Sequence, residues 1–463
     1  MAGKTIGDVA LFILFVFLSR AFGQEGIGLY SLAMALTGFF AVVGDFGLNP
    51  YAIKELSRKD TALAERSSQI LSLRIVLLIA ALGALLLVLP LLRYPLDFKL
   101  IFVVIGTYQL TRVMAEGLAT IFIAQEDAHL AGVIEVSFKV VSAGGAIAVG
   151  VLGGSLVLAI TVLPVVTLGQ VFGTYWVASK KYGSPRLILS RQSLWQVMRE
   201  ASPYAFSRFL LQLYTRADVV MLGFLISTVA AGIYNVAYRV IFLLSFLPHF
   251  AASAVFPQAS RLYATSNMEF KALYQNSLNL IILLGLPIGG GLWVIAPDLI
   301  TLLFGDAFEG SVVVLRLLSV LVPLLFLSRM MGVFLMSCNR QVDRTKFYVI
   351  VATFNVVGNL ALIPVWGVAG AALVALVSEA ILVTLFATRL RDVVGWPRVN
   401  SRHLLGIVGV ASFLLPFTLL PSLSMGVVIP ASAILYAAVL LSSKQTRQNE
   451  GRMLMNLLKR GRS

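Results

Sequence analysis

The chain has 463 residues, of which 59% are hydrophobic and only 12% are charged, and its formal net charge is +15. Soluble globular domains carry about 25% charged residues, so the composition excludes an ordinary soluble domain. It predicts an all-α integral membrane protein, because a helix satisfies its own backbone hydrogen bonds in lipid. The basic residues are spread over many gaps between apolar stretches, which argues against a nucleic-acid partner. The single Cys338 excludes an intramolecular disulfide, and we expect no metal site and no cofactor.

Apolar stretches of about 20 residues, the length that crosses a bilayer, recur along the chain and predict about 14 transmembrane helices. The predicted limits are 6–20, 27–49, 70–90, 99–121, 130–152, 156–178, 200–224, 229–252, 273–296, 311–336, 346–364, 369–388, 404–421 and 425–442. Most of the 36 Lys and Arg residues lie in alternate gaps, and only Arg93 and Lys99 lie in the other gaps. Because basic loops stay in the cytoplasm, we expect a multi-pass protein of the cytoplasmic (plasma) membrane with both termini cytoplasmic.

An internal repeat divides the predicted helices into two sets. Gly28-Leu29-Tyr30 opens the second span and Gly232-Ile233-Tyr234 opens the eighth, while residues 138–141 resemble residues 354–357. Such a duplication predicts two pseudo-symmetric six-helix lobes plus two extra C-terminal helices. The predicted parts are an N-lobe (1–180), a cytoplasmic linker (181–199), a C-lobe (200–390), the last two spans (391–442) and a basic tail (443–463). The linker fits an interfacial amphipathic helix or a solvated connection equally well.

Span 7 carries a polar stripe. Tyr204, Arg208, Gln212 and Arg216 recur every four residues and therefore share one face of a helix. Arg inside the apolar layer is costly and faces a cavity or a partner. One interpretation is the cationic wall of a water-filled cavity. The other is helix packing, with each Arg paired to an acid such as Asp218 or Glu379.

Other charged residues follow the same four-residue spacing. Tyr108, Arg112 and Glu116 lie on span 4, Glu135 and Lys139 are placed to pair on span 5, and Asn235 and Arg239 lie on span 8. Cations outnumber acids at membrane depth. Because guanidinium binds phosphate oxygens in pairs, this excess indicates an anionic substrate. Arg74, near the cytoplasmic end of span 3, is expected to extend to the lipid headgroups.

Acids and helix breakers within the spans have two interpretations each. Glu379, Asp8 and Glu116 are candidates for binding a coupling ion, although ordinary ion pairs explain them as well. Gly285 in span 9 and Pro323 in span 10 mark places where a helix could kink or hinge, but both residue types are frequent in membrane helices.

Four segments in order resemble a known family. They are Ser19–Tyr30, Asp45-Phe46-Gly47-Leu48, Tyr214–Asp218 and Leu302–Phe308. Together they are similar to the Wzx-type polysaccharide flippases of the multidrug/oligosaccharidyl-lipid/polysaccharide exporter superfamily. The short first span departs from the family pattern.

The resemblance implies alternating-access flipping of a polyprenyl-(pyro)phosphate-linked oligosaccharide for cell-surface polysaccharide, coupled to Na⁺ or H⁺. It also implies glycosyltransferases and a glycan polymerase as partners, besides membrane lipids. The predicted substrate-binding residues are Arg208, Arg239, Arg112, Arg216, Lys139, Gln212, Asn235 and Tyr108. No catalytic constellation is visible, so we expect a transporter and not an enzyme. The alternatives are a cation-coupled multidrug exporter of the same superfamily, an integral-membrane polysaccharide polymerase or ligase, and a non-transporting scaffold.

Overall fold

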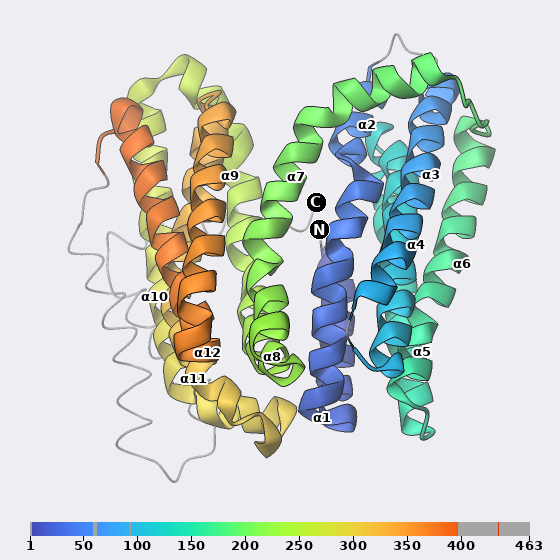
Figure 1. Ribbon diagram of the computed structural model, residues 1–463. Helices are drawn as coiled ribbons and strands as arrows, with labels where there is room; N and C mark the ends of the chain where they lie inside the picture. Colours follow the sequence, from blue (N-terminus) through green and yellow to red (C-terminus); the bar gives the residue numbers. More distant parts are fainter. Residues whose placement is uncertain (1, 59–62, 93, 397–433, 435–463) are drawn as a thin grey trace. The chain divides into compact units, whose positions relative to one another are not determined.

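The computed structural model describes residues 2–58, 63–92, 94–396 and 434, and these residues are helical almost throughout (Figure 1). In chain order the helices are α1 (Ala2–Asp45), α2 (Leu48–Leu56), α3 (Leu63–Val88), α4 (Leu96–Ala124), α5 (Ala128–Val151), α6 (Leu156–Tyr182), α7 (Arg191–Leu225), α8 (Thr228–Leu244), α9 (Phe246–Thr265), α10 (Asn267–Phe304), α11 (Gly310–Ser337) and α12 (Gln341–Val394). Two short 3₁₀ helices, η1 (Leu89–Leu91) and η2 (Asp306–Phe308), complete the set. The predicted all-α membrane fold is confirmed. The last two predicted spans, 404–421 and 425–442, lie outside the described residues.

Two of the helices are each two helices joined at a glycine. α1 has 44 residues and α12 has 54, so a straight rod would measure roughly 66 and 81 Å at 1.5 Å per residue. The hydrocarbon core is only about 30 Å thick. Gly23 (φ 65°) breaks α1 and Gly367 (φ 54°) breaks α12, in the region of φ where glycine is tolerated without strain. The breaks fall between the paired spans that the sequence predicts there.

Within the described part of the chain, nine helical stretches are long and apolar enough to cross a membrane. α7 is not among them. Arg208, Arg216 and Asp218 fall within its apolar portion, which lowers its hydropathy although the sequence predicts a span at 200–224.

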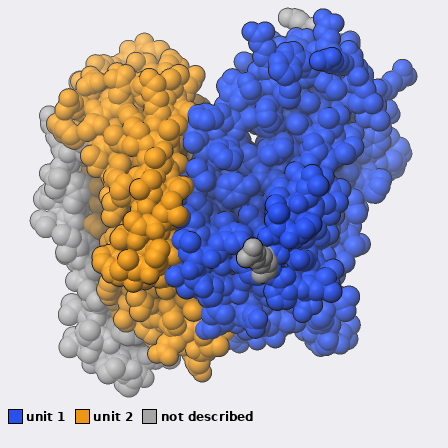
Figure 2. Space-filling model, viewed as in Figure 1, with its two compact units in different colours: residues 1–232 blue, residues 233–463 orange. Residues whose placement is uncertain are grey.

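The chain divides into two compact units after Gly232, shown in separate colours in Figure 2. In unit 1, α4 packs on α1 and α6, α5 packs on α1 and α6, and α7 packs on α1, α2 and α3. In unit 2, α11 packs on α9, α10 and α12. The sequence repeat groups α7 with the second set of helices, but α7 makes its contacts in unit 1.

Spans 9 and 10, where the sequence allows a kink or hinge, each form one continuous helix. α10 and α11 are continuous and contain no non-helical residue, although Pro287 and Pro323 lie inside them. A Cβ on Gly289 would lie 2.7 Å from the carbonyl oxygen of Ser319, and one on Gly285 would lie 3.1 Å from the Cα of Pro323. These glycines therefore allow the backbones of α10 and α11 to approach closely, as small residues do in membrane proteins.

The two glycines that the repeat makes equivalent lie against each other. A Cβ on Gly232 would lie 3.0 Å from the Cα of Gly28, and a Cβ on Gly28 would lie 2.2 Å from the carbonyl oxygen of Thr228. Both contacts fall within unit 1. The start of α8 therefore packs directly on the backbone of α1 at a position where no side chain fits.

The turn between α4 and α5 is held to the end of α6. Asp127 accepts a hydrogen bond of 2.6 Å from the Lys181 ammonium and another from the Tyr182 hydroxyl. The Lys181 hydrogen bond, with that of Tyr182, holds the pKa of Asp127 below its ordinary value. The contact therefore stabilises the fold at neutral pH and is lost as the pH falls through the lowered pKa.

Candidate functional site

Three helices of unit 1 meet at one carboxylate. Asp45, at the end of α1, lies 3.4 Å from Nη1 of Arg74 on α3 and 3.3 Å from Nε of Arg208 on α7. The side chains of Asp45 and Arg74 are 3% and 0% exposed, whereas that of Arg208 is 45% exposed. The same carboxylate thus compensates one fully buried guanidinium and holds a second one at the surface of the unit. We call Asp45, Arg74 and Arg208 the Asp45 triad.

The expectation that Arg74 extends to the headgroups is wrong. Its Nη1 also donates to the carbonyl of Val113 at 2.9 Å, and its Nη2 donates to Oδ1 of Asn49 at 2.9 Å. Gly117 makes room for it, because a Cβ there would lie 2.4 Å from the Arg74 guanidinium carbon. A buried charge persists only where a counter-ion and hydrogen bonds compensate it; Asp45 supplies the counter-ion, and Val113 and Asn49 accept the hydrogen bonds.

The polar stripe of α7 lies partly on its packing face. Gly47 has φ 70°, and a Cβ on it would lie 2.6 Å from the Cβ of Tyr204. Gln212 Nε2 donates to the carbonyl of Ala35 at 3.5 Å. For Tyr204, Arg208 and Gln212 the packing interpretation therefore describes the geometry, with Asp45 in place of the acids named from the sequence. Arg208 nevertheless keeps almost half of its side-chain surface exposed.

A second cluster lies inside unit 1, between α1, α4, α5 and α6. Lys139 pairs with Glu135 at 2.7 Å and with Asp8 at 2.9 Å, and Arg112 pairs with Glu116 at 3.0 Å. The predicted pairing of Glu135 with Lys139 is confirmed. We call these five residues the charged cluster.

The cavity beside the charged cluster is small. It has a volume of about 30 Å³, and its wall includes Tyr108, Thr167 and Gln170. A cavity of this size holds about one or two water molecules, while the Arg112 and Glu116 side chains beside it remain 42% and 36% exposed. The structure thus brings together Tyr108, Arg112, Lys139, Asp8 and Glu116, which the sequence predicted separately.

The remaining predicted residues lie on other elements. Glu379 on α12 is buried and accepts a hydrogen bond from the Ser328 hydroxyl of α11. The hydroxyl of Ser378, which precedes Glu379 in α12, accepts a hydrogen bond of 3.3 Å from Nδ2 of Asn355. On α8, Asn235 is buried and Arg239 is partly exposed. Among the described residues, no group of three or more His, Cys, Asp or Glu side chains is placed to hold a metal ion.

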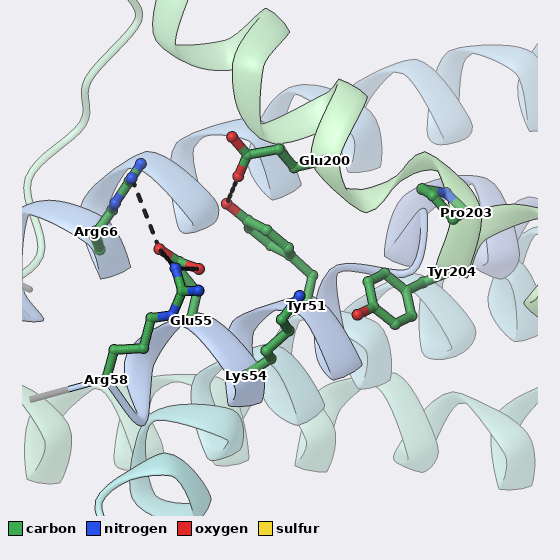
Figure 3. A pocket seen from close by; sticks show the side chains of 8 residues that line it. All are labelled: Tyr51, Lys54, Glu55, Arg58, Arg66, Glu200, Pro203 and Tyr204. Atoms are coloured by element: carbon green, nitrogen blue, oxygen red, sulfur yellow. Dashed lines mark hydrogen bonds and ion pairs between the residues drawn. The ribbon is translucent and has the colours of Figure 1, made fainter. Parts of the chain in front are cut away.

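Sequence reasoning missed a cavity between α2, α3 and α7. Its volume is about 410 Å³. Figure 3 shows Glu55 between the guanidinium groups of Arg58 and Arg66, and the Tyr51 hydroxyl directed at Glu200. The basic residues of these segments were predicted only as markers of the cytoplasmic side, because the cavity forms between segments about 140 residues apart.

Comparisons with known proteins agree with this architecture. The model of the family described as polysaccharide biosynthesis protein matches residues 1–263, more than half of the chain. The chain belongs to this family. It is also 23% identical over 430 residues to the probable low-salt glycan biosynthesis flippase Agl15 of Haloferax volcanii, covering 86% of this chain and 85% of that one.

Solved structures share the fold of this family member. A lipid II flippase MurJ in an inward closed conformation superposes with a TM-score of 0.79 at 12% identity, covering 95% of this chain and 97% of the other. An inward-facing multidrug resistance MATE transporter of the MOP superfamily gives a TM-score of 0.66 at 15% identity, covering 88% and 95%. The family match over residues 1–263 confirms the predicted resemblance to a polysaccharide-biosynthesis family, and these solved structures show the same fold.

Proposed function

We propose that the protein flips a polyprenyl-(pyro)phosphate-linked oligosaccharide from the cytoplasmic to the outer leaflet of the cytoplasmic membrane by alternating access. Both termini then lie in the cytoplasm, as the distribution of Lys and Arg predicts. Membership of the polysaccharide biosynthesis family and the similarity to a probable glycan biosynthesis flippase support the substrate class. Glycosyltransferases would supply such a substrate and a glycan polymerase would consume it.

The proposal depends most on the contacts and the exposure of Arg208. Its Nε is engaged by Asp45 at 3.3 Å, and its two terminal nitrogens form no hydrogen bond with the described part of the chain. Asp45 is itself fixed by Arg74, so the guanidinium plane of Arg208 is oriented in advance. Two parallel N–H groups on a fixed plane match two oxygens of a phosphate. A half-exposed arginine side chain within a membrane-spanning segment needs such a partner, or water, because lipid solvates it poorly.

The other predicted residues divide into two groups. Gln212, Arg216, Asn235 and Arg239 are proposed to bind the glycan or its phosphates, as in the sequence-based prediction. Tyr108, Arg112 and Lys139 adjoin a cavity of about 30 Å³, which has room for a small ion or one or two water molecules. We therefore assign these three residues to ion coupling instead.

The charged cluster is proposed as the coupling site for Na⁺ or H⁺. Its three acids, Asp8, Glu116 and Glu135, exceed its two cations by one negative charge. One more cation, or one proton, would neutralise it in a cavity of matching size. Glu379 in unit 2 is the alternative coupling residue that the sequence predicts.

Replacing Arg208 with alanine is expected to abolish export of the surface glycan while the protein remains in the membrane. The physical reason is the loss of the only terminal nitrogens that the Asp45 triad directs outward. Surface glycan is measured by labelling intact cells, and membrane content by immunoblotting. The matched control is Arg261→Ala, which removes an exposed Arg of α9. Normal export by both Arg208→Ala and Arg239→Ala would refute the proposed substrate-binding residues. A deletion strain that is sensitive to drugs but keeps its surface glycan would favour a multidrug exporter.

Replacing Glu116 with glutamine is expected to uncouple transport from the ion gradient. The substitution keeps the side-chain size and removes one negative charge next to Arg112. In reconstituted vesicles, the wild type should respond to an imposed Na⁺ or H⁺ gradient, and Glu116→Gln should show at least about a tenfold smaller response. A variant that responds to the gradient like the wild type excludes Glu116 from coupling; Glu379→Gln then tests the alternative.

A further inference from the structure

The cavity between α2, α3 and α7 has the chemistry of an anion site. Its volume of about 410 Å³ lies within the roughly 300–1,000 Å³ that is usual for small-molecule sites. Most of the residues that line it are polar or charged: Tyr51, Lys54, Glu55, Arg58, Arg66, Glu200 and Tyr204. None of them belongs to the Asp45 triad or to the charged cluster, so the cavity is separate from the residues proposed to carry transport.

A buried carboxylate orients the two arginines. The Glu55 side chain is 7% exposed and lies 3.3 Å from Nη1 of Arg58 and 3.7 Å from Nη2 of Arg66 (Figure 3). Arg66 also donates from Nη1 to Gln69 at 3.0 Å. Glu55 therefore acts as a positioning residue, because its carboxylate holds both guanidinium groups at the wall of the cavity.

The second acid of the cavity is hydrogen-bonded to two neutral side chains. Glu200 accepts a hydrogen bond of 2.6 Å from the Tyr51 hydroxyl and one of 3.1 Å from Gln196. Lys54 is exposed and forms no hydrogen bond or ion pair with the described part of the chain. Three cations against two acids leave one positive charge, which a singly charged phosphodiester would balance.

The position of the cavity at the ends of the helices favours a lipid anion. α2 ends at Leu56 with the first apolar stretch, and α3 begins at Leu63. The cavity thus lies where apolar helices end, at the level of lipid headgroups. Basic pockets between membrane helices at this level bind anionic headgroups.

We propose that this cavity binds the phosphate group of a membrane lipid. The donors are Lys54, Arg58 and Arg66, with Glu55 fixing the two arginines. The phosphate has two sources, a bilayer phospholipid such as phosphatidylglycerol or the polyprenyl phosphate of the transported lipid. The proposal stands without the proposed function, because a headgroup site would exist whatever the protein transports.

The test uses the purified full chain in an uncharged detergent. Dihexanoyl-phosphatidylglycerol, a short-chain polyprenyl phosphate and inorganic phosphate are titrated separately, and the thermal unfolding midpoint gives the apparent affinity of each. The variant is Lys54→Gln with Arg58→Gln, both exposed side chains. The control is Arg261→Gln with Lys271→Gln, which removes the same charge from exposed residues of α9 and α10.

The wild type and the control should be stabilised by at least one lipid phosphate, and the affinity should fall at least about tenfold in the cavity variant. Stabilisation by phosphatidylglycerol identifies a headgroup site, and stabilisation by polyprenyl phosphate alone identifies a site for the transported lipid. Lys54→Gln alone should give a smaller loss of the same kind. Equal affinities in the cavity variant and the control, or equal binding of inorganic phosphate, would overturn the proposal. Loss of headgroup binding with unchanged flipping would leave the proposed function intact.

Discussion

Replacing Arg74 with alanine is expected to remove most of the folded protein. The guanidinium is fully buried, pairs with Asp45, and donates to Asn49 and to the carbonyl of Val113. Its removal leaves Asn49 and the Val113 carbonyl without this donor inside the protein. It also removes one of the two counter-ions of Asp45. Breaking a buried pair costs about 3–5 kcal/mol, which is comparable to the total stability of about 5–15 kcal/mol of many proteins.

The control for Arg74→Ala is Arg391→Ala. The side chain of Arg391 is 54% exposed and lies 3.7 Å from Asp392, and exposed pairs contribute about 0–1 kcal/mol. The unfolding midpoints of both variants and the yield of monodisperse protein are measured in the same detergent. Asp45→Asn combined with Arg74→Met should recover part of the loss, because the charge and its counter-charge are removed together. A midpoint of Arg74→Ala equal to that of Arg391→Ala would contradict the buried triad.

Replacing Gly28 with alanine is expected to destabilise the packing of α1 on the start of α8. The new Cβ would lie 2.2 Å from the carbonyl oxygen of Thr228, and a backbone atom cannot move aside as a side chain does. Overpacking costs about 1–3 kcal/mol where side chains adapt, so a larger loss is expected here.

Gly144→Ala on α5 is the matched control for Gly28→Ala. A Cβ on Gly144 would meet nothing within 4 Å, and alanine favours a helix by about 1 kcal/mol over glycine. The two substitutions are chemically identical and should therefore move the unfolding midpoint in opposite directions. Stabilisation by Gly28→Ala would show that α1 and α8 do not pack as described.

Local patterns allowed correct prediction of the all-α membrane fold and of contacts within one helix. The paired spans in α1 and α12 follow from apolar length, and the pairing of Glu135 with Lys139 follows from their separation of four residues. The repeat in the sequence also indicated the equivalence of Gly28 and Gly232, although not their direct contact. These features depend on residues close in the chain or on a copied segment.

Contacts between distant segments were not predictable in the same way. Asp45 meets Arg74 and Arg208 across separations of 29 and 163 residues, and no local spacing encodes such a meeting. The position of Arg74 near a span end suggested the headgroups, whereas Asn49 and Gly117 in fact provide an internal site for it. The cavity near Glu55 was missed for the same reason.

The central claim is that the protein moves a lipid-linked oligosaccharide across a bilayer with Arg208 holding its phosphate. The most direct measurement follows a fluorescent polyprenyl-pyrophosphate oligosaccharide in vesicles that contain the purified protein, with a membrane-impermeant glycosidase cleaving only the glycan on the outer side. We predict that wild-type protein delivers the inner pool to the glycosidase over time, while Arg208→Ala vesicles match protein-free ones. Delivery by the wild type no faster than in protein-free vesicles, or equal delivery by Arg208→Ala, would contradict the claim.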